Sequence, residues 1–279
     1  MAFYLVTVAV LFSAPGASAN VVIRYHAPIE QNDTQKDYFI ILLKQVCKTL
    51  QEENTHCKLT PIGLPMRQQK QLDSLNSGLI DIVWTVTTKE RETNYLPIRI
   101  PLMNGLMGYR IAVANKRHRS VFTKNYDLND LRTLRLAQGK DWPDTPILKA
   151  NGFNVIGFSR YEKLYRDTSS GLYDYTLRGV LEVYSEFEKF KQPNVFIDQN
   201  LLFKYPSAIY FFVKKDNQML ANQISKALTQ LKQTGEFDKI FSEFKNHKLA
   251  LNQAELEKRI TIELVNNNIT IPTLIEKQN

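Results

Sequence analysis

The feature that most constrains the fold is an alternation of short apolar runs with helical patterns near the start of the chain. Residues 21–25, 58–62 and 79–84 have the length of strands, and the first and third are rich in branched apolar side chains. Residues 35–52 and 66–76 lie between them, and the first of these carries apolar side chains at helical spacing. Strands that alternate with helices in this way pair in parallel. The pattern therefore predicts an α/β fold in which helices flank a mainly parallel sheet.

A second α/β series follows a strand expected at residues 106–114. Its expected strands are 134–137, 154–158 and 173–177, its helices include 161–168 and 180–191, and a strand 209–213 and a helix 218–234 come later. No linker rich in Pro, Gly or Ser separates the two series, so we expect two lobes with the chain crossing between them more than once. Ligands of open parallel sheets bind at the carboxyl ends of the strands, which places the expected site in the cleft between the lobes.

Composition excludes several classes of protein. With 43% hydrophobic and 23% charged residues, the chain has the composition of a folded globular protein. No apolar run reaches the roughly 18 residues of a membrane-spanning helix. The chain has 36 Lys and Arg against 28 Asp and Glu, but the basic residues are scattered, which argues against nucleic-acid binding. Four His, two Cys and the lack of a nucleotide-binding motif predict neither a metal site nor a cofactor.

The first 19 residues have the pattern of an export signal. They contain no charged side chain, and Ala17-Ser18-Ala19 before Asn20 matches the small-x-small site of signal peptidase. We therefore expect a cleaved signal peptide, residues 1–19, and a periplasmic mature chain. A buried first strand or helix is the alternative.

The two cysteines lie close together in the sequence. Cys47 falls late in an expected helix and Cys57 at the start of an expected strand. An oxidising compartment would favour a disulfide between them, and so short a loop would stabilise the chain by ~2–3 kcal/mol. Two unpaired thiols are the alternative.

Several short motifs together resemble a known family. Gly78-Leu79-Ile80-Asp81, Thr87-Thr88-Lys89-Glu90-Arg91 and Gly108-Tyr109-Arg110 are similar to motifs of the bacterial extracellular solute-binding proteins of family 3. Residues 97–102, 139–145 and 178–183 resemble an orphan, transporter-type substrate-binding branch of that superfamily. The resemblance covers about residues 21–247, with a further string at 259–261.

The resemblance implies the two-lobe, type II periplasmic-binding-protein fold. A first lobe would comprise residues 20–109 together with 207–279, which return to it and form a tail, and residues 110–206 would form the second lobe. The lobes would close on a small-molecule ligand by a hinge motion. We expect a monomer that presents its ligand to an ABC permease or to a membrane sensor.

The resemblance also assigns site residues in the first lobe. Arg91 matches the family arginine that grips a ligand carboxylate, and a guanidinium suits that role because it can bind both oxygens. Thr88 would add a hydroxyl and a backbone N–H. A surface arginine beside Glu90 and Glu92 is the alternative.

Aromatic and glycine residues complete the expected cleft. Trp84 and Trp142 follow strands of the two series and could sandwich a ligand, with core packing as the alternative for each. Gly139 precedes a helix start, where free amides suit an anionic group. Tyr25 and Tyr161 are weaker candidates, chosen from their position in the chain.

Arg178 departs from the family pattern. It stands near the position at which the amino-acid binders carry an acid that pairs with the ligand's ammonium. We therefore expect Arg178 and Arg91 to face one another unpaired and to select a ligand with a carboxylate and a second anionic group. The alternative is that Arg178 turns outward and pairs with Glu182, four residues on.

These observations predict a non-enzymatic periplasmic solute-binding protein for a small carboxylate-bearing solute. A dehydratase-like enzyme on the same fold is one alternative, because fold alone does not determine function. A structural or interaction partner in the cell envelope is another.

Overall fold

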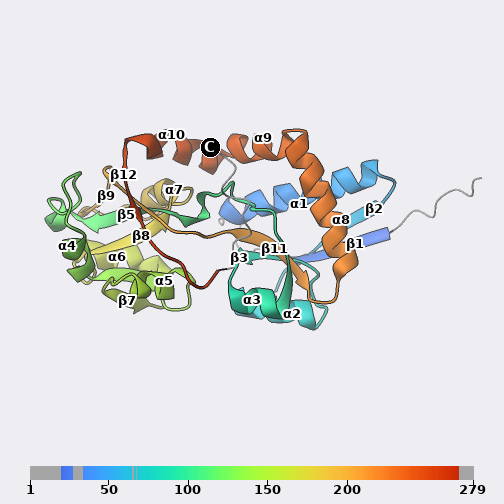
Figure 1. The fold of residues 1–279 in the computed structure, drawn as a ribbon, viewed down its shortest axis with the longest axis horizontal. Coiled ribbons are helices and arrows are strands. Elements are labelled where there is room, and N and C mark those ends of the chain that lie inside the picture. The colour runs from blue at the N-terminus through green and yellow to red at the C-terminus, as the bar shows by residue number, and fades with distance from the viewer. Residues whose placement is uncertain (1–19, 28–33, 65, 67, 270–279) are drawn as a thin grey trace, which may run out of the picture.

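The computed structural model describes residues 20–27, 34–64, 66 and 68–269. The expected signal peptide, residues 1–19, lies outside them. The described residues form a mixed α/β fold with two lobes side by side along the long axis of the molecule (Figure 1). Within these ranges, no helix combines the length and apolar character needed to span a membrane.

The first lobe contains two small sheets joined by one bridge. Its strands are β1 (Asn20–His26), β2 (His56–Ile62), β3 (Val83–Val86), β4 (Tyr95–Ile98) and β11 (Ile209–Lys214). β1 and β2 pair in parallel, β11 lies antiparallel between β3 and β4, and a parallel bridge from Tyr25 to Ile82 links the two sheets. The helices of this lobe are α1 (Thr34–Glu52), α2 (Gln68–Asn76), α3 (Lys89–Asn94), α8 (Gln218–Gln233) and α9 (Glu236–Glu243).

The second lobe is built on one seven-stranded sheet of order β12-β10-β5-β8-β6-β7, with β9 also paired to β5. Its strands are β5 (Tyr109–Asn115), β6 (Leu136–Gly139), β7 (Val155–Phe158), β8 (Tyr175–Gly179), β9 (Val195–Ile197), β10 (Leu201–Lys204) and β12 (Ile260–Glu263). Its helices are α4 (Leu128–Thr133), α5 (Asp144–Ala150), α6 (Leu164–Ser169), α7 (Val183–Lys189) and α10 (Lys245–Ala254). β6, β7 and β8 run in parallel, so their carboxyl ends share one edge.

The α/β class with two lobes is confirmed, and each lobe also contains antiparallel pairs. These pairs involve β5 and β11, the strands that follow the passages of the chain between the lobes. Strands joined by a helix within one lobe, such as β6 and β7, pair in parallel instead.

The core follows the helical spacing of apolar residues. In α1, Phe39, Leu42, Leu43 and Val46 are buried, as their three- and four-residue spacing predicts. Burying each of these side chains contributes roughly 1.5–3 kcal/mol before the cost of ordering the chain. α8 packs its own apolar face on α1 and thereby covers the first lobe.

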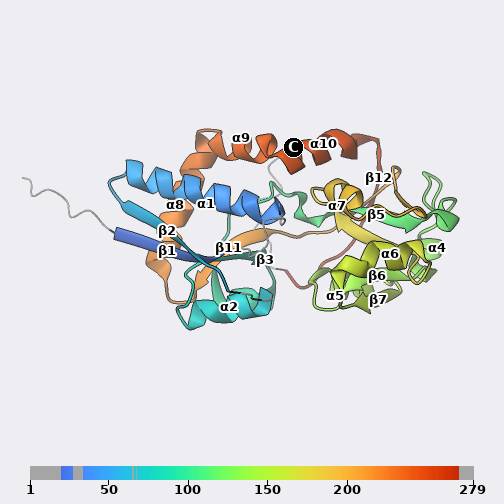
Figure 2. The same ribbon diagram turned by 180° about the vertical axis from the view of Figure 1, so that it is seen from behind.

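The C-terminal part of the chain visits both lobes. α9 and α10 lie end to end along one long side of the molecule (Figures 1 and 2), with α9 packed on α8 and α10 packed on α7. β12 then pairs in parallel with β10 of the second lobe. The sequence placed residues 207–279 with the first lobe and a tail. β12 pairs with a strand that lies about 60 residues earlier in the sequence, and no local sequence pattern predicts a pairing over that separation.

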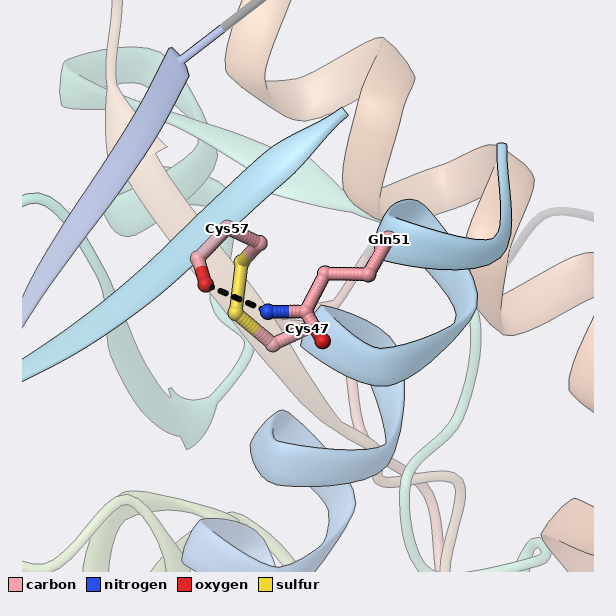
Figure 3. Close-up of a disulfide and its surroundings, with 3 residues drawn as sticks. All are labelled: Cys47, Gln51 and Cys57. Carbon is pink, nitrogen blue, oxygen red and sulfur yellow. Dashed lines mark hydrogen bonds between the residues drawn. A yellow bond between two sulfur atoms is a disulfide. The ribbon is translucent and has the colours of Figure 1, made fainter. Parts of the chain in front are cut away.

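A disulfide joins Cys47 of α1 to Cys57 of β2, with the two Cα atoms 5.3 Å apart. The side-chain amide of Gln51, one turn after Cys47, donates a hydrogen bond of 2.9 Å to the carbonyl of Cys57 (Figure 3). The disulfide and this hydrogen bond together fix the end of α1 against the start of β2.

Loss of this disulfide should destabilise the first lobe. We expect the Cys47→Ala/Cys57→Ala double variant to lose ~2–3 kcal/mol of unfolding free energy, because the cross-link no longer restricts the unfolded chain. Urea denaturation of both chains would measure the difference. Free-thiol titration of the denatured, unreduced parent provides the control, and two reactive thiols in it would contradict the pairing.

Candidate functional site

A cavity of about 310 Å³ lies between the two lobes. Its walls come from α2 and α3 of the first lobe, from the turn between β6 and α5 of the second, and from one residue of the C-terminal tail. The lining residues are Gln69, Leu72, Thr88, Glu90, Arg91, Asn94, Tyr95, Lys140, Asp141, Trp142, Pro143, Pro146 and Asn268.

Arg91 lies in the first turn of α3 and is held by neutral oxygen atoms. Its Nη1 donates to Thr85 Oγ1 at 2.8 Å and to the Val86 carbonyl at 2.6 Å, while Nη2 donates to Gln68 Oε1 at 2.9 Å. Thr88 caps α3, because its hydroxyl oxygen accepts a 3.2 Å bond from the Arg91 backbone N–H. The cap of α3 thus fixes the backbone of Arg91, while β3 and α2 fix its guanidinium.

The charge of Arg91 has no carboxylate partner within ion-pair distance among the described residues. Burial lowers the pKa of Arg91, and the nearby charge of Glu90 offsets this only in part. A guanidinium stays charged in proteins, so Arg91 keeps a partly buried positive charge that no ion pair among the described residues compensates. An anion in the cavity would supply that compensation.

The wall contributed by the second lobe centres on Trp142. Its ring lies directly over Gly139, where a Cβ atom would stand 2.5 Å from the indole. Phe158 packs edge-on against Trp142 with ring centroids 5.3 Å apart. Gly139 therefore serves this wall by leaving room for the indole, since any larger residue would displace it.

Arg178 is buried and bound to two glutamates, which contradicts the expectation of an unpaired guanidinium facing Arg91. Its Nε donates to Glu186 Oε2 at 2.7 Å and its Nη2 to Glu186 Oε1 at 2.6 Å, a two-point ion pair. Nη2 also lies 3.2 Å from Glu182 Oε2. The alternative pair with Glu182 is present, but Arg178 is buried and does not turn outward to make it. Glu186, eight residues after Arg178, adds the shorter contact.

Two carboxylates, those of Glu182 and Glu186, balance the positive charge of Arg178. Burial alone would raise the pKa of Glu186, but the Arg178 guanidinium outweighs this and lowers it. The pKa of Glu182 is raised, chiefly by burial and further by the adjacent charge of Glu186. Two carboxylates on one guanidinium leave Arg178 no net positive charge to offer a second anionic group of a ligand.

The remaining aromatic candidates lie outside the cavity lining. Tyr25 is buried in the first lobe, whereas Trp84 is half-buried. Trp84 stacks on Phe39 at 5.5 Å and lies 6.5 Å from Tyr25, so it packs against the edge of that core. Tyr161 packs 6.3 Å from Trp142, on the side where Arg178 covers both rings. Tyr161 and Arg178 thus contact Trp142 without lining the cavity themselves.

The structure therefore brings Thr88, Arg91 and Trp142 into one cavity, as the sequence predicted for a cleft. Lys140 and Asn268 were not predicted. Lys140 follows Gly139 directly and could have been found from its place at the end of a strand. Asn268 enters from the tail, and no signal in the sequence places it there. Within the described ranges, no group of three or more His, Cys, Asp or Glu could hold a metal ion.

Comparison with known families identifies the class of the protein. The model of the bacterial extracellular solute-binding proteins, family 3, matches residues 29–247. The chain belongs to this family, and the resemblance inferred from its motifs is confirmed. None of the curated protein sequences compared with the chain matches it.

Solved structures share the fold at low sequence identity. The probable amino-acid ABC transporter extracellular-binding protein YtmK from Bacillus subtilis is 20% identical with a TM-score of 0.61, covering 82% of this chain and 99% of YtmK. An ancestral arginine-binding protein bound to arginine is 20% identical with a TM-score of 0.60, covering 80% and 98%. An ancestral amino-acid-binding protein, a precursor of cyclohexadienyl dehydratase, is 17% identical with a TM-score of 0.58, covering 80% and 94%. At these identities the likeness establishes the fold alone.

The ion pair of Arg178 yields a stability prediction. Arg178→Ala should cost roughly 3–5 kcal/mol of unfolding free energy, because it leaves Glu186 charged and poorly hydrated. The double variant Arg178→Met/Glu186→Gln should be less destabilised, since it removes both charges. Chemical denaturation would measure the unfolding free energy of the parent, of Arg178→Ala and of the double variant.

Arg166→Ala is the matched control, because the Arg166 side chain is 58% exposed and pairs only with its neighbour Asp167 among the described residues. That variant should stay within ~0.5 kcal/mol of the parent. An Arg178→Ala chain as stable as the control would show that the buried pair contributes nothing.

Proposed function

We propose that the chain is a periplasmic solute-binding protein that captures a small, amino-acid-like solute with a free carboxylate in the cavity between its lobes. The observation that carries this proposal is Arg91, a guanidinium in the cavity wall whose hydrogen bonds go to neutral oxygens. A carboxylate placed against it would gain a charge-assisted contact without displacing an existing ion pair.

The size of the cavity agrees with a small solute. Its volume of about 310 Å³ lies at the low end of ligand pockets, which span about 300–1,000 Å³. Trp142 offers a flat apolar surface beside the charged groups, and such a surface suits the aliphatic or aromatic part of a solute.

The charge of the cavity favours a ligand that carries both signs. The lining contains two cationic side chains, Arg91 and Lys140, and two anionic ones, Glu90 and Asp141. A second anionic group on the ligand would meet these carboxylates, and Arg178 is already neutralised by Glu182 and Glu186. We therefore propose a zwitterionic or amino-acid-like solute rather than a dianion.

The fold supports capture by closure. The cavity is bounded by both lobes, so a bound solute would contact them together and favour their approach. Delivery of the solute to an ABC permease or to a membrane sensor, and export of the chain to the periplasm as a monomer, complete the proposal.

Binding is the function that this cavity supports best. Both carboxylates of the lining, Glu90 and Asp141, are exposed. Catalytic acids and bases commonly act in surroundings that exclude water, and these two carboxylates face solvent.

A thermal-shift screen with matched compounds would test the proposal. Each L-amino acid would be compared with its carboxamide, which keeps the ammonium and the side chain but lacks the carboxylate. At 100 times its dissociation constant, a ligand should add about 2.7 kcal/mol of stability, and its carboxamide should add far less because Arg91 stays uncompensated. Equal shifts from an amino acid and its carboxamide, or no shift from any amino acid, would contradict the proposal.

A further inference from the structure

The chain crosses between the lobes once more after β12, through residues 264–268. These residues continue from the end of β12 in the second lobe and reach α3 in the first, as the last described part of the chain in Figure 1 shows. Each end of this short segment is held by hydrogen bonds.

The segment is fixed to the second lobe at Leu264 and Val265. The Leu264 N–H donates to the Lys204 carbonyl at 2.7 Å, which extends the pairing of β12 with β10 by one residue. The side chain of Asn151, at the end of α5, then binds the backbone of Val265 twice. Its amide donates to the Val265 carbonyl at 2.8 Å, and its oxygen accepts from the Val265 N–H at 3.0 Å.

Asn266 holds the middle of the segment. Its side-chain amide donates to the carbonyl of Pro206 at 2.8 Å, within the passage of the chain from β10 to β11. Its side-chain oxygen accepts a 3.0 Å bond from the Asn268 N–H. The segment thus lies alongside one of the connections between the lobes.

The segment is fixed to the first lobe at Lys89. The Lys89 backbone N–H donates to the Asn268 carbonyl at 3.1 Å, and its ammonium donates to the Asn267 carbonyl at 2.8 Å. Lys89 is the first residue of α3, where backbone N–H groups have no partner within the helix. The bond therefore satisfies an N–H that the helix leaves open, two residues before Arg91.

The segment also borders the cavity, and it lies outside the part of the chain that the family model matches. Asn268 lines the cavity together with Arg91 and Trp142. The match to family 3 ends at residue 247, so β12 and residues 264–268 are additional to it.

We propose that residues 264–268 form an inter-lobe clasp, which limits opening of the cleft and supplies a third wall of the cavity. From Val265 to Asn268 there are three residue steps, which span at most roughly 11 Å when extended. With both ends held, the lobes cannot separate beyond that reach. Wide opening of the cleft therefore requires release of the contacts at Lys89. The role as a cavity wall rests on the proposed function, whereas the restriction of opening does not.

Ligand-free distance measurements test the clasp. Fluorophores would be introduced as non-natural amino acids at Lys70 and Glu162, two exposed positions in different lobes. A chain ending at Leu264 keeps β12 and loses the clasp, and a chain ending at Ile269 keeps both. We expect single-molecule energy transfer to show a longer and broader inter-lobe distance for the chain ending at Leu264. The parent and the chain ending at Ile269 should share one narrow distribution.

A point variant keeps the test valid if truncation disturbs folding. Asn266→Ala removes the bonds to Pro206 and to Asn268 without shortening the chain. The bond to the Asn268 N–H shapes the turn that presents the Asn268 carbonyl to Lys89, so its loss should weaken the contact at Lys89 and shift the distance in the same direction. Asn222→Ala is the matched control, because Asn222 is exposed on α8 and bonds only Gln218 among the described residues. Hydrogen exchange at the Lys89 amide should quicken on the order of tenfold in the clasp variants alone.

Distances and exchange rates that match the parent in both clasp variants would overturn the proposal. Because no ligand is present, this result does not depend on what the cavity binds. A clasped chain that binds no amino acid would contradict the proposed function and leave the clasp standing.

Discussion

The site depends on the guanidinium of Arg91, whose hydrogen bonds within the described ranges go to neutral oxygens and not to a carboxylate. Arg91 is fixed by Thr85, Val86 and Gln68, so its position is set before any ligand arrives. Preorganisation of this kind lowers the cost of binding, because the side chain has little freedom left to lose. The strand β3, the cap at Thr88 and the short helix α3 can all be understood as the support that this arrangement needs.

The second lobe contributes an aromatic surface at Trp142 beside one charge of each sign, Lys140 and Asp141. Trp142 lies on Gly139 and is backed by Tyr161 and Arg178, whose own charge is cancelled by two glutamates. The guanidinium of Arg178 also packs against the indole, with its Cζ 4.6 Å from the ring centroid. The first lobe thus contributes the fixed guanidinium of Arg91, and the second contributes the indole surface of Trp142.

Features that depend on neighbouring residues could be predicted from the sequence. The apolar stripe of α1, the turn that carries Arg91 and the proximity of Cys47 to Cys57 all follow from short spacings. Features set by the packing of distant elements could not. The Glu186 pair of Arg178 depends on how α7 turns back over β8, and the expectation of an unpaired Arg178 failed for this reason. The place of Asn268 depends on β12 joining a sheet whose next strand, β10, ends about 60 residues earlier.

The central claim is that Arg91 binds a ligand carboxylate between the lobes. Calorimetric titration of the parent, Arg91→Ala and Arg166→Ala with the amino acid that gives the largest thermal shift tests it most directly. Loss of a charge-assisted contact should weaken binding by roughly 30-fold or more in Arg91→Ala, while Arg166→Ala, remote from the cavity lining, should bind like the parent. Equal affinity of Arg91→Ala and the parent, with both chains folded, would contradict the account.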